Sequence, residues 1–166
     1  MKNASGTDNS TNGDGTSCYW VQSGSLPGGN VNIWFKPGNN HITLEKSEIT
    51  GSTMSGILGE GSYKQILSNY SHDNGTEPDD HGIYYAGSNS VIANNVFYNN
   101  YGYGVQIAYA GAAGNIIANN TSVHNGHGYV SCYPDSGYVT FSGATNNKFV
   151  NNIAYNNGKY GFETYD

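Results

Sequence analysis

The chain repeats one nine-residue phrase, which reads Ile92-Ala-Asn-Asn-Val-Phe-Tyr-Asn-Asn100 in one copy. Two further copies begin at Ile117 and Phe149, and a degenerate copy begins at Ile66. The starting positions 66, 92, 117 and 149 are separated by 26, 25 and 32 residues. A nearly constant period of this size is typical of a solenoid, in which each repeat forms one coil.

A shorter phrase accompanies each copy and places a glycine before a β-prone run. Its copies are His81-Gly-Ile-Tyr-Tyr, Tyr103-Gly-Val-Gln-Ile, His127-Gly-Tyr-Val-Ser and Tyr160-Gly-Phe-Glu-Thr, with a fainter one at Ser55-Gly-Ile-Leu-Gly. Each unit therefore holds short β-prone runs separated by Gly and Asn, and no helical period lies between them. The pattern predicts an all-β fold and excludes leucine-rich, ankyrin and tetratricopeptide repeats.

Stacked coils bring equivalent residues above one another, about 4.8 Å apart. Two asparagine columns are then expected: Asn69, Asn95, Asn120 and Asn152, and Asn74, Asn100, Asn125 and Asn157. Asparagine tolerates the left-handed backbone of tight corners. Its amide can also donate to one neighbour in the column and accept from the other. We therefore expect structural ladders at the corners, without a chemical role.

The Asn-Asn phrase followed by a Gly-Ile or Gly-Val strand resembles the repeat of pectate-lyase-like proteins, over roughly residues 40–166. This resemblance implies an all-β, right-handed parallel β-helix of about five to six coils. The family includes polysaccharide lyases, glycosidases, uronate epimerases, phage tailspikes and non-catalytic surface proteins. The resemblance therefore implies the fold more specifically than an activity.

Length and composition predict one domain preceded by a short segment. Residues 1–17 are rich in Ser, Thr, Asn and Gly, which predicts a flexible N-terminal segment. Residues 18–166 are expected to form the β-helix, with 18–40 as its N-terminal capping coil. The sequence stops at Asp166 inside a repeated strand, so we expect either a longer solenoid or end-to-end self-association.

The net charge and the absence of targeting signals bear on which partners the protein can bind: nucleic acid, anionic glycans or membranes. The net charge is −6 and all six basic residues are lysines, which excludes a basic stripe for nucleic acid. A polyanionic glycan would need a bridging cation. No transmembrane run is present and no apolar signal sequence follows Met1, so we expect no membrane partner. The composition resembles that of secreted proteins, which predicts a secreted or cell-surface protein whose signal peptide lies outside this sequence.

Two cysteines leave the redox compartment open. Cys132 is predicted to pack as a small residue in a column with Ala86 and Ala108. A disulfide between Cys18 and Cys132 is one alternative.

Acidic side chains cluster between His72 and His81. The sequence predicts a cation site, most suited to calcium, from Asp73, Glu77, Asp79 and Asp80. A solvated acidic loop is the alternative.

Alternation along the glycine-led strands predicts which side chains face outward. If Ile83, Val105, Tyr129 and Phe162 face the core, the outer column is Leu58, Tyr84, Gln106, Val130 and Glu163. Tyrosine platforms and an amide suit a shallow groove for a sugar chain, whereas an ordinary solvated face is the alternative. A further column precedes the glycines: His81, Tyr103, His127 and Tyr160. These rings either pack or supply a general acid or base.

Together these features favour an extracellular carbohydrate-active protein that binds or cleaves a polysaccharide or oligosaccharide along this groove, by lyase-like chemistry if it is catalytic. The candidate catalytic residues are His81, Tyr84, Gln106 and His127, and the candidate substrate-binding residues are Tyr103, Glu163 and Asp135. The lack of arginine counts against a lyase, which must neutralise a carboxylate. A glycosidase would need two carboxylates from among Asp79, Asp80, Asp135 and Glu163. A non-catalytic structural or adhesin-type solenoid is the alternative.

Overall fold

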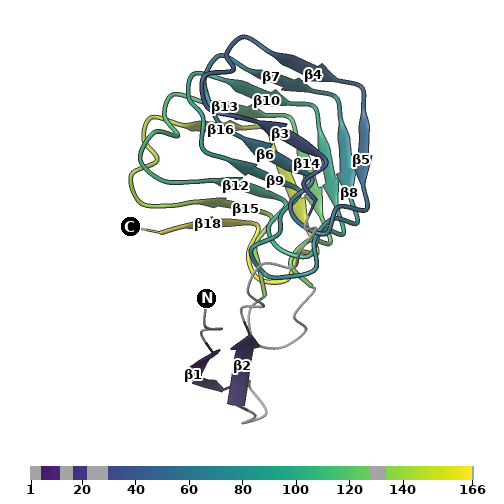
Figure 1. The fold of residues 1–166 in the computed structure, drawn as a ribbon, viewed down its shortest axis with the longest axis vertical. Helices are drawn as coiled ribbons and strands as arrows, with labels where there is room; N and C mark the ends of the chain where they lie inside the picture. Colours follow the sequence, from purple (N-terminus) through teal and green to yellow (C-terminus); the bar gives the residue numbers. More distant parts are fainter. Residues whose placement is uncertain (1–4, 12–16, 22–29, 128–133, 166) are drawn as a thin grey trace.

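A computed structural model describes residues 5–11, 17–21, 30–127 and 134–165. All regular secondary structure in these residues is β-strand, and three parallel sheets surround a common core (Figure 1). The described chain contains no helix that is long and apolar enough to cross a membrane. The structure therefore confirms the predicted all-β parallel solenoid, with about five coils.

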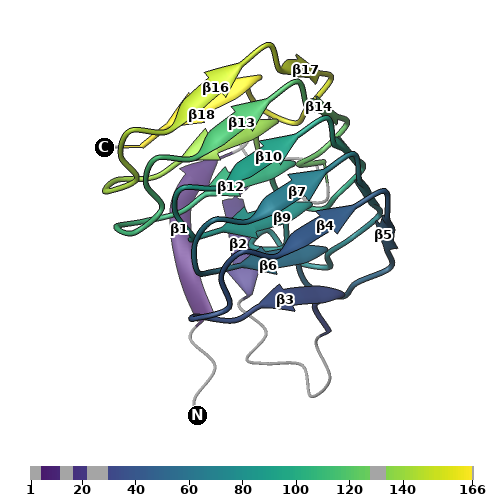
Figure 2. The same ribbon diagram turned by 90° about the horizontal axis from the view of Figure 1, so that it is seen from above.

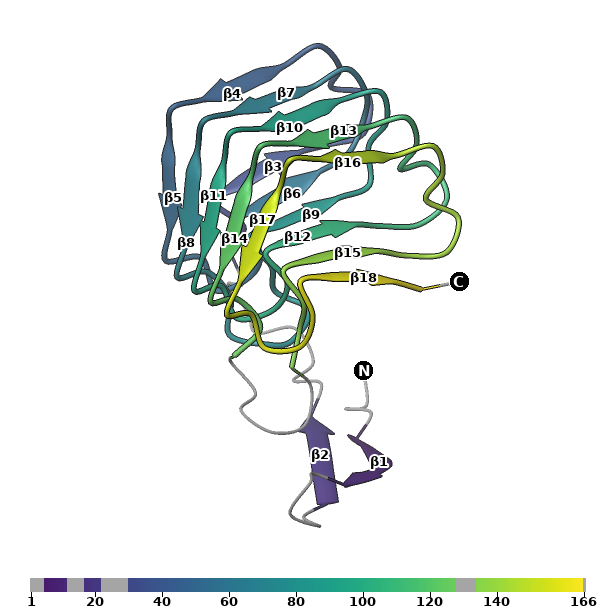
Figure 3. The same cartoon turned by 180° about the vertical axis from the view of Figure 1, so that it is seen from behind.

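Each sheet takes one strand from each successive coil (Figures 2 and 3). The six-stranded sheet contains β3 (Ile33–Phe35), β6 (Ile57–Gly59), β9 (Ile83–Tyr85), β12 (Val105–Ile107), β15 (Tyr138–Thr140) and β18 (Phe162–Thr164). The second sheet contains β4 (Thr43–Glu45), β7 (Gln65–Leu67), β10 (Val91–Ala93), β13 (Ile116–Ala118) and β16 (Lys148–Val150). The third contains β5 (Glu48–Thr50), β8 (Tyr70–His72), β11 (Val96–Tyr98), β14 (Thr121–Val123) and β17 (Ile153–Tyr155).

The N-terminal strands lie outside these stacks. Strands β1 (Ser5–Thr11) and β2 (Ser17–Val21) pair with each other in an antiparallel sheet. Part of the segment predicted to be flexible therefore forms β1. Of the predicted capping coil, 18–40, only β3 joins a parallel sheet.

The described asparagine ladders confirm both predicted columns. Asn100 shows the pattern, because its Nδ2 donates to the Oδ1 of Asn125 at 2.9 Å and to the carbonyl of Ser71 at 3.0 Å. Its Oδ1 accepts from the Nδ2 of Asn74 at 3.0 Å and from the backbone N–H of Asn74 at 3.2 Å. Each ladder amide therefore joins consecutive coils, and both its donor and its acceptor groups have hydrogen-bond partners in the core.

The two asparagines of each Asn-Asn pair have different structural roles at a corner. The first residue takes the left-handed backbone, at Asn94, Asn99, Asn119, Asn151 and Asn156. The second residue builds the ladder with its side chain. Serine, aspartate and histidine replace the first residue at Ser68, Asp73 and His124, each with a positive φ.

A third ladder was not predicted from the sequence. The backbone N–H of Ser90 donates to the Oδ1 of Asn115 at 2.9 Å, and that of Asn115 donates to the Oδ1 of Asn147 at 2.9 Å. These residues lie five positions before the first ladder, at Asn95, Asn120 and Asn152. The five-residue spacing Asn115, Asn120, Asn125 was the sequence signal for it.

The glycine of the shorter phrase makes room for the ladder. A Cβ at Gly82 would lie 2.7 Å from the Nδ2 of Asn100, and one at Gly104 would lie 2.9 Å from that of Asn125. The two repeated phrases are therefore coupled sterically, because a side chain at the glycine would displace the amide at the corner.

The register of β15 corrects one prediction. Tyr138 pairs with Val105 on one side and with Phe162 on the other, so it occupies the position predicted for Tyr129. The sequence Gly-Tyr-Val occurs at 128–130 and again at 137–139, and the second copy forms the strand. The extra residues of the long repeat therefore precede the strand.

The second copy fits the core because its tyrosine is both packed and hydrogen-bonded. The hydroxyl of Tyr138 donates to the carbonyl of Asn120 at 2.9 Å, and its ring stacks on Phe162 at 4.6 Å. This change of register also moves three neighbouring assignments by nine residues, those of His127, Val130 and Cys132. Their places are taken by Ser136, Val139 and Phe141. Val130 and Cys132 lie outside the described residues, and the side chain of Cys18 does too.

Candidate functional site

The outer face of the six-stranded sheet carries a row of side chains, one from each coil. The register aligns them in the order Trp34, Leu58, Tyr84, Gln106, Val139 and Glu163. Beside this row lie three further aromatic residues: Tyr109, Phe141 and Tyr165. Trp34 and Tyr109 are 52% and 55% exposed, so the face offers aromatic surface to the solvent. We call these nine residues the outer row.

His81 lies beneath this face as a buried, neutral side chain. Its Nδ1 accepts the backbone N–H of Tyr103 at 3.0 Å, and a second hydrogen bond joins its side chain to Gln106. Its ring lies 5.1 Å from that of Tyr103 and 6.1 Å from that of Tyr84. Burial lowers the pKa of His81 to about 3, against the opposing hydrogen bond to Gln106. This geometry suits orientation of Tyr103 and Gln106 better than proton abstraction.

Tyr84 is a protonated phenol at neutral pH. Burial raises its pKa to about 12, and the nearby Tyr109, Asp79 and Glu60 add to the rise. A protonated tyrosine can stack its ring on a ligand and donate a hydrogen bond.

Asp135 forms the acidic end of the site. It is 8% exposed, and its Oδ2 has no hydrogen-bond partner among the described residues. Burial raises the pKa of Asp135 to about 7, and the charges of Asp79 and Glu163 add to this against a hydrogen bond from Tyr103. Burial likewise raises the pKa of Tyr103. Asp135 therefore carries a proton in a large fraction of molecules at neutral pH.

Unlike Asp135, Glu163 has hydrogen-bond or ion-pair partners for both of its carboxylate oxygens. Ser136 donates its Oγ–H to Oε2 of Glu163 at 2.7 Å, and Lys159 forms an ion pair with Oε1. Burial opposes ionisation, but the hydrogen bonds from Lys159, Ser136 and Tyr165 outweigh it and lower the pKa of Glu163. Glu163 is therefore the ionised carboxylate of the site.

The structure brings together six of the residues proposed from the sequence: His81, Tyr84, Tyr103, Gln106, Asp135 and Glu163. Sequence reasoning missed Trp34, Tyr109, Phe141, Tyr165 and Lys159. Phe141 and Tyr165 lie two residues beyond the outward positions on β15 and β18, so extending the alternation would have found them.

His127 lies elsewhere. Its ring contacts that of His124 at 4.4 Å, and its Nε2 hydrogen-bonds to the carbonyl of Asn156 at 2.9 Å. It borders an open pocket of about 330 Å³ at the corner that follows the third sheet. The pocket is lined by Asp73, Asn74, Gly75, Asn99, Asn100, Tyr101 and His127.

The four acids predicted to bind calcium do not converge. The Oδ2 of Asp80 accepts the backbone N–H groups of Thr76 and Glu77 at 2.9 and 2.8 Å, which closes a local turn. Asp73 instead contacts His72 and Asn99. Across the described ranges, no three His, Cys, Asp or Glu side chains are grouped to hold a metal ion. Backbone amides already bond one oxygen of Asp80, and the calcium site stays a prediction from the sequence.

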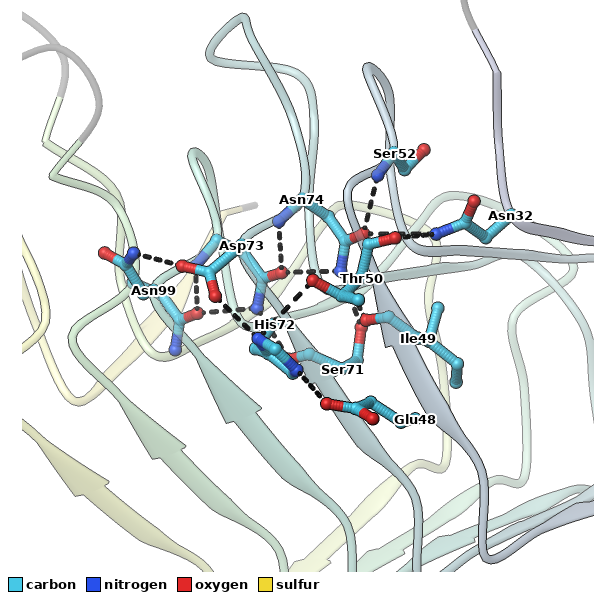
Figure 4. A network of polar contacts seen from close by, with 12 residues as sticks. Asn32, Glu48, Ile49, Thr50, Ser52, Ser71, His72, Asp73, Asn74 and Asn99 are labelled. Carbon is cyan, nitrogen blue, oxygen red and sulfur yellow. Dashed lines mark hydrogen bonds and ion pairs between the residues drawn. The ribbon is translucent and has the colours of Figure 1, made fainter.

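His72 lies between two carboxylates and joins neighbouring coils (Figure 4). Its Nε2 is 3.0 Å from Oε1 of Glu48 on β5, and its Nδ1 is 2.6 Å from Oδ2 of Asp73. Tyr70 stacks on the His72 ring at 4.0 Å. Burial lowers the pKa of His72, but the hydrogen bonds to Asp73 and Glu48 outweigh it, and the net pKa is raised. The hydrogen bond to His72 is also the main cause that lowers the pKa of Asp73.

We expect this network to make stability depend on pH. The contribution of His72 is complete below the pKa of an unfolded histidine, about 6.5, and is lost as pH rises through the higher folded value. That of Asp73 is present above its unfolded pKa and is lost as pH falls through the lower folded value. In urea unfolding, the difference in free energy of unfolding between wild type and His72→Gln should therefore decrease by up to about 1 kcal/mol between pH 6 and pH 8.

His41→Gln is the matched control, because His41 stacks on Tyr63 at 4.9 Å rather than lying between carboxylates. It should keep the wild-type dependence of stability on pH. An identical pH profile for wild type and His72→Gln would refute the coupling.

Comparison with known proteins agrees with the fold. The profile of the family described as right handed beta helix region matches residues 7–166. Searches of curated proteins and of solved structures found no match. The family profile covers nearly the whole chain, and the protein therefore belongs to the right-handed β-helix family.

Proposed function

We propose that this protein binds a polysaccharide outside the cell, along the outer row of the six-stranded sheet. The observation that carries the proposal is the outer row itself, in which the exposed rings of Trp34, Tyr109 and Tyr165 lie around the partly buried Tyr84 and the buried amide of Gln106. The carboxyl of Glu163 lies in the same row, and that of Asp135 lies near it. Sugar rings present apolar C–H faces and a rim of hydroxyls. Aromatic rings suit the faces, whereas amides and carboxylates suit the hydroxyls.

The dimensions of the row suit an extended ligand. Six strands at about 4.8 Å spacing extend the row over about 24 Å. Aromatic side chains lie near both ends, with Trp34 on β3 and Tyr165 beyond β18. A chain of several sugar units can contact such a row more readily than a compact ligand can.

The charges of the face favour a neutral glycan. Carboxylates surround it, from Glu60 and Asp79 near Tyr84 to Asp135 and Glu163 at the other end. Lys159 is already paired with Glu163. A polyuronate would meet like charge along this face, so its binding is disfavoured.

The same face offers little support for a lyase. β-Elimination beside a uronate carboxylate needs a base and a group that neutralises that carboxylate. Here the buried His81 is neutral and hydrogen-bonded, Tyr84 is protonated, and the chain has no arginine. Lyase activity on pectate or alginate would appear as ultraviolet absorbance of an unsaturated uronate, and we expect none.

Calorimetric titration of neutral hexasaccharides of glucose, xylose, galactose and N-acetylglucosamine tests the binding. We expect affinity for at least one of them, and Tyr84→Ala and Tyr109→Ala should each weaken it at least about tenfold, or 1.4 kcal/mol. Tyr155→Ala is the control, because Tyr155 is 69% exposed on β17 of another sheet. Equal losses in all three variants, or no binding to any neutral glycan, would leave a structural or adhesin-type solenoid as the better explanation.

A further inference from the structure

The outer face of the second sheet has an apolar centre. The middle residue of each strand packs toward the core, so the first and third residues face outward in two rows. The strand register gives the first row as Thr43, Gln65, Val91, Ile116 and Lys148, and the second as Glu45, Leu67, Ala93, Ala118 and Val150. On the central strands β7, β10 and β13, every outward residue except Gln65 is apolar, and Ile116 is 42% exposed. A continuous apolar surface of this kind suits contact with another protein surface.

This face is separate from the outer row. In Figure 3, the second sheet lies across the top of the solenoid and the six-stranded sheet lies below it. Side chains of both sheets meet in one core, as Ile92 of β10 and Val105 of β12 do. The outward faces of the two sheets therefore point away from each other, and a partner on the second sheet would leave the outer row accessible.

Opposite charges lie at opposite ends of the apolar face. Glu45 is on β4, the first strand of the second sheet, and Lys148 is on β16, the last described strand, and both side chains are exposed. A two-fold contact between identical surfaces brings each residue of one copy to the same partner residue of the other. A surface with one charge at each end is complementary to itself under such a rotation.

Rotation about an axis that lies in the interface, parallel to the strands, places β4 of one copy opposite β16 of the other. Glu45 then lies diagonally across from Lys148 of the other copy, two residues along the strand. Packed sheets lie about 10 Å apart and two strand residues span about 7 Å, so the two backbones are about 12 Å apart, a distance that extended lysine and glutamate side chains can close. The same rotation places Leu67 opposite Ala118, a large side chain against a small one, as close packing requires.

We propose that this protein forms a two-fold symmetric dimer through the outer faces of the second sheets, with Glu45 of each copy paired to Lys148 of the other. The five strands extend over about 19 Å, so the contact is smaller than a standard interface, and we expect a dissociation constant of about 100 μM. Such a dimer presents its two outer rows on opposite sides. It could therefore hold two polysaccharide chains at once, a consequence that rests on the proposed polysaccharide binding, whereas the dimer itself does not.

Analytical ultracentrifugation over a range of protein concentrations tests the dimer. The weight-average mass of wild type should rise from 17.7 kDa toward twice that value. Ile116→Asp should weaken association at least about tenfold, because it places a charge in the apolar centre of the contact. Ile153→Asp is the matched control, because Ile153 is 58% exposed on β17 of the third sheet, and it should keep the wild-type dissociation constant within about twofold.

A charge exchange tests the arrangement of the two copies. Glu45→Lys and Lys148→Glu each place like charges opposite one another, and each should weaken association at least about threefold. The double variant that carries both substitutions restores opposite charges across the interface. Its dissociation constant should return to within about twofold of wild type, which the sum of two independent losses would not give.

Three results would overturn the dimer. Wild type that stays monomeric at about ten times the expected dissociation constant would exclude it. Association that Ile116→Asp leaves unchanged would place the contact elsewhere, such as end to end, and a mass above that of a dimer would contradict the two-fold arrangement. A double variant that does not recover would refute the pairing of Glu45 with Lys148. Circular dichroism of each variant verifies the fold, and no measurement uses a sugar, so failure here leaves the polysaccharide proposal unaffected.

Discussion

Replacing Asn100 with alanine will lower the free energy of unfolding by about 4 kcal/mol. The Asn100 side chain makes four hydrogen bonds in the core, two as donor and two as acceptor. Its loss removes a partner from the carbonyl of Ser71, the amide side chain of Asn125 and the backbone and side chain of Asn74, at about 1 kcal/mol each. Urea unfolding followed by circular dichroism measures the change.

Asn94→Gly is the control for this substitution. Asn94 is exposed and has a positive φ, which glycine adopts without strain, so we expect a change of no more than about 0.5 kcal/mol. A loss below about 1.5 kcal/mol for Asn100→Ala would show that the ladder contributes far less than its hydrogen bonds imply.

The second large effect is expected from Gly104→Ala. The added Cβ would lie 2.1 Å from Oγ of Ser122, 2.8 Å from the carbonyl of Gly137 and 2.9 Å from Nδ2 of Asn125. Two of these neighbours belong to the ladder corner and the third is backbone, so relief requires the coils to separate. We expect a loss of about 3 kcal/mol or more in the same unfolding measurement.

Gly161→Ala supplies the matched comparison. Gly161 has the same position in the last described coil, but a Cβ there would meet only the Cβ of Ala154, at 3.2 Å. Its loss should stay below about 1 kcal/mol. Equal losses at Gly104 and Gly161 would mean that backbone entropy, rather than the clash with the ladder, explains the glycine of the repeat.

The fold was predictable because one interaction recurs in every coil. A corner asparagine hydrogen-bonds to its equivalents in the coils above and below, so the 26- and 25-residue steps determine both the stacking and the register. The register of β15 was not predictable in this way. Two Gly-Tyr-Val copies lie nine residues apart, and the choice depends on how the Tyr138 ring packs against Phe149 and Phe162.

The position of the candidate site was predictable from the sequence, but the protonation states of its side chains were not. Alternation along β9 and β12 correctly placed Tyr84 and Gln106 on one face. The state of His81 depends on burial between coils, which a sequence pattern does not contain. Nor does proximity in sequence reveal that Asp80 accepts two backbone hydrogen bonds within its own turn.

The ladders and the outer row are parts of one arrangement. The ladders fix the spacing of the coils, and that spacing sets the positions of Tyr84, Gln106 and Glu163 along the face. Side chains on a rigid sheet lose little freedom when a ligand binds. A polysaccharide would therefore meet a row of contacts that is already ordered before binding.

The most direct test of the binding face is a crystal structure of the protein with a bound neutral hexasaccharide. We expect sugar rings stacked on Tyr84 and Tyr109 along the six-stranded sheet, with hydroxyls near Asp135 and Glu163. Sugar bound only elsewhere, such as at the corner pocket beside Asp73 and His127, would contradict the assignment of the outer row as the binding face.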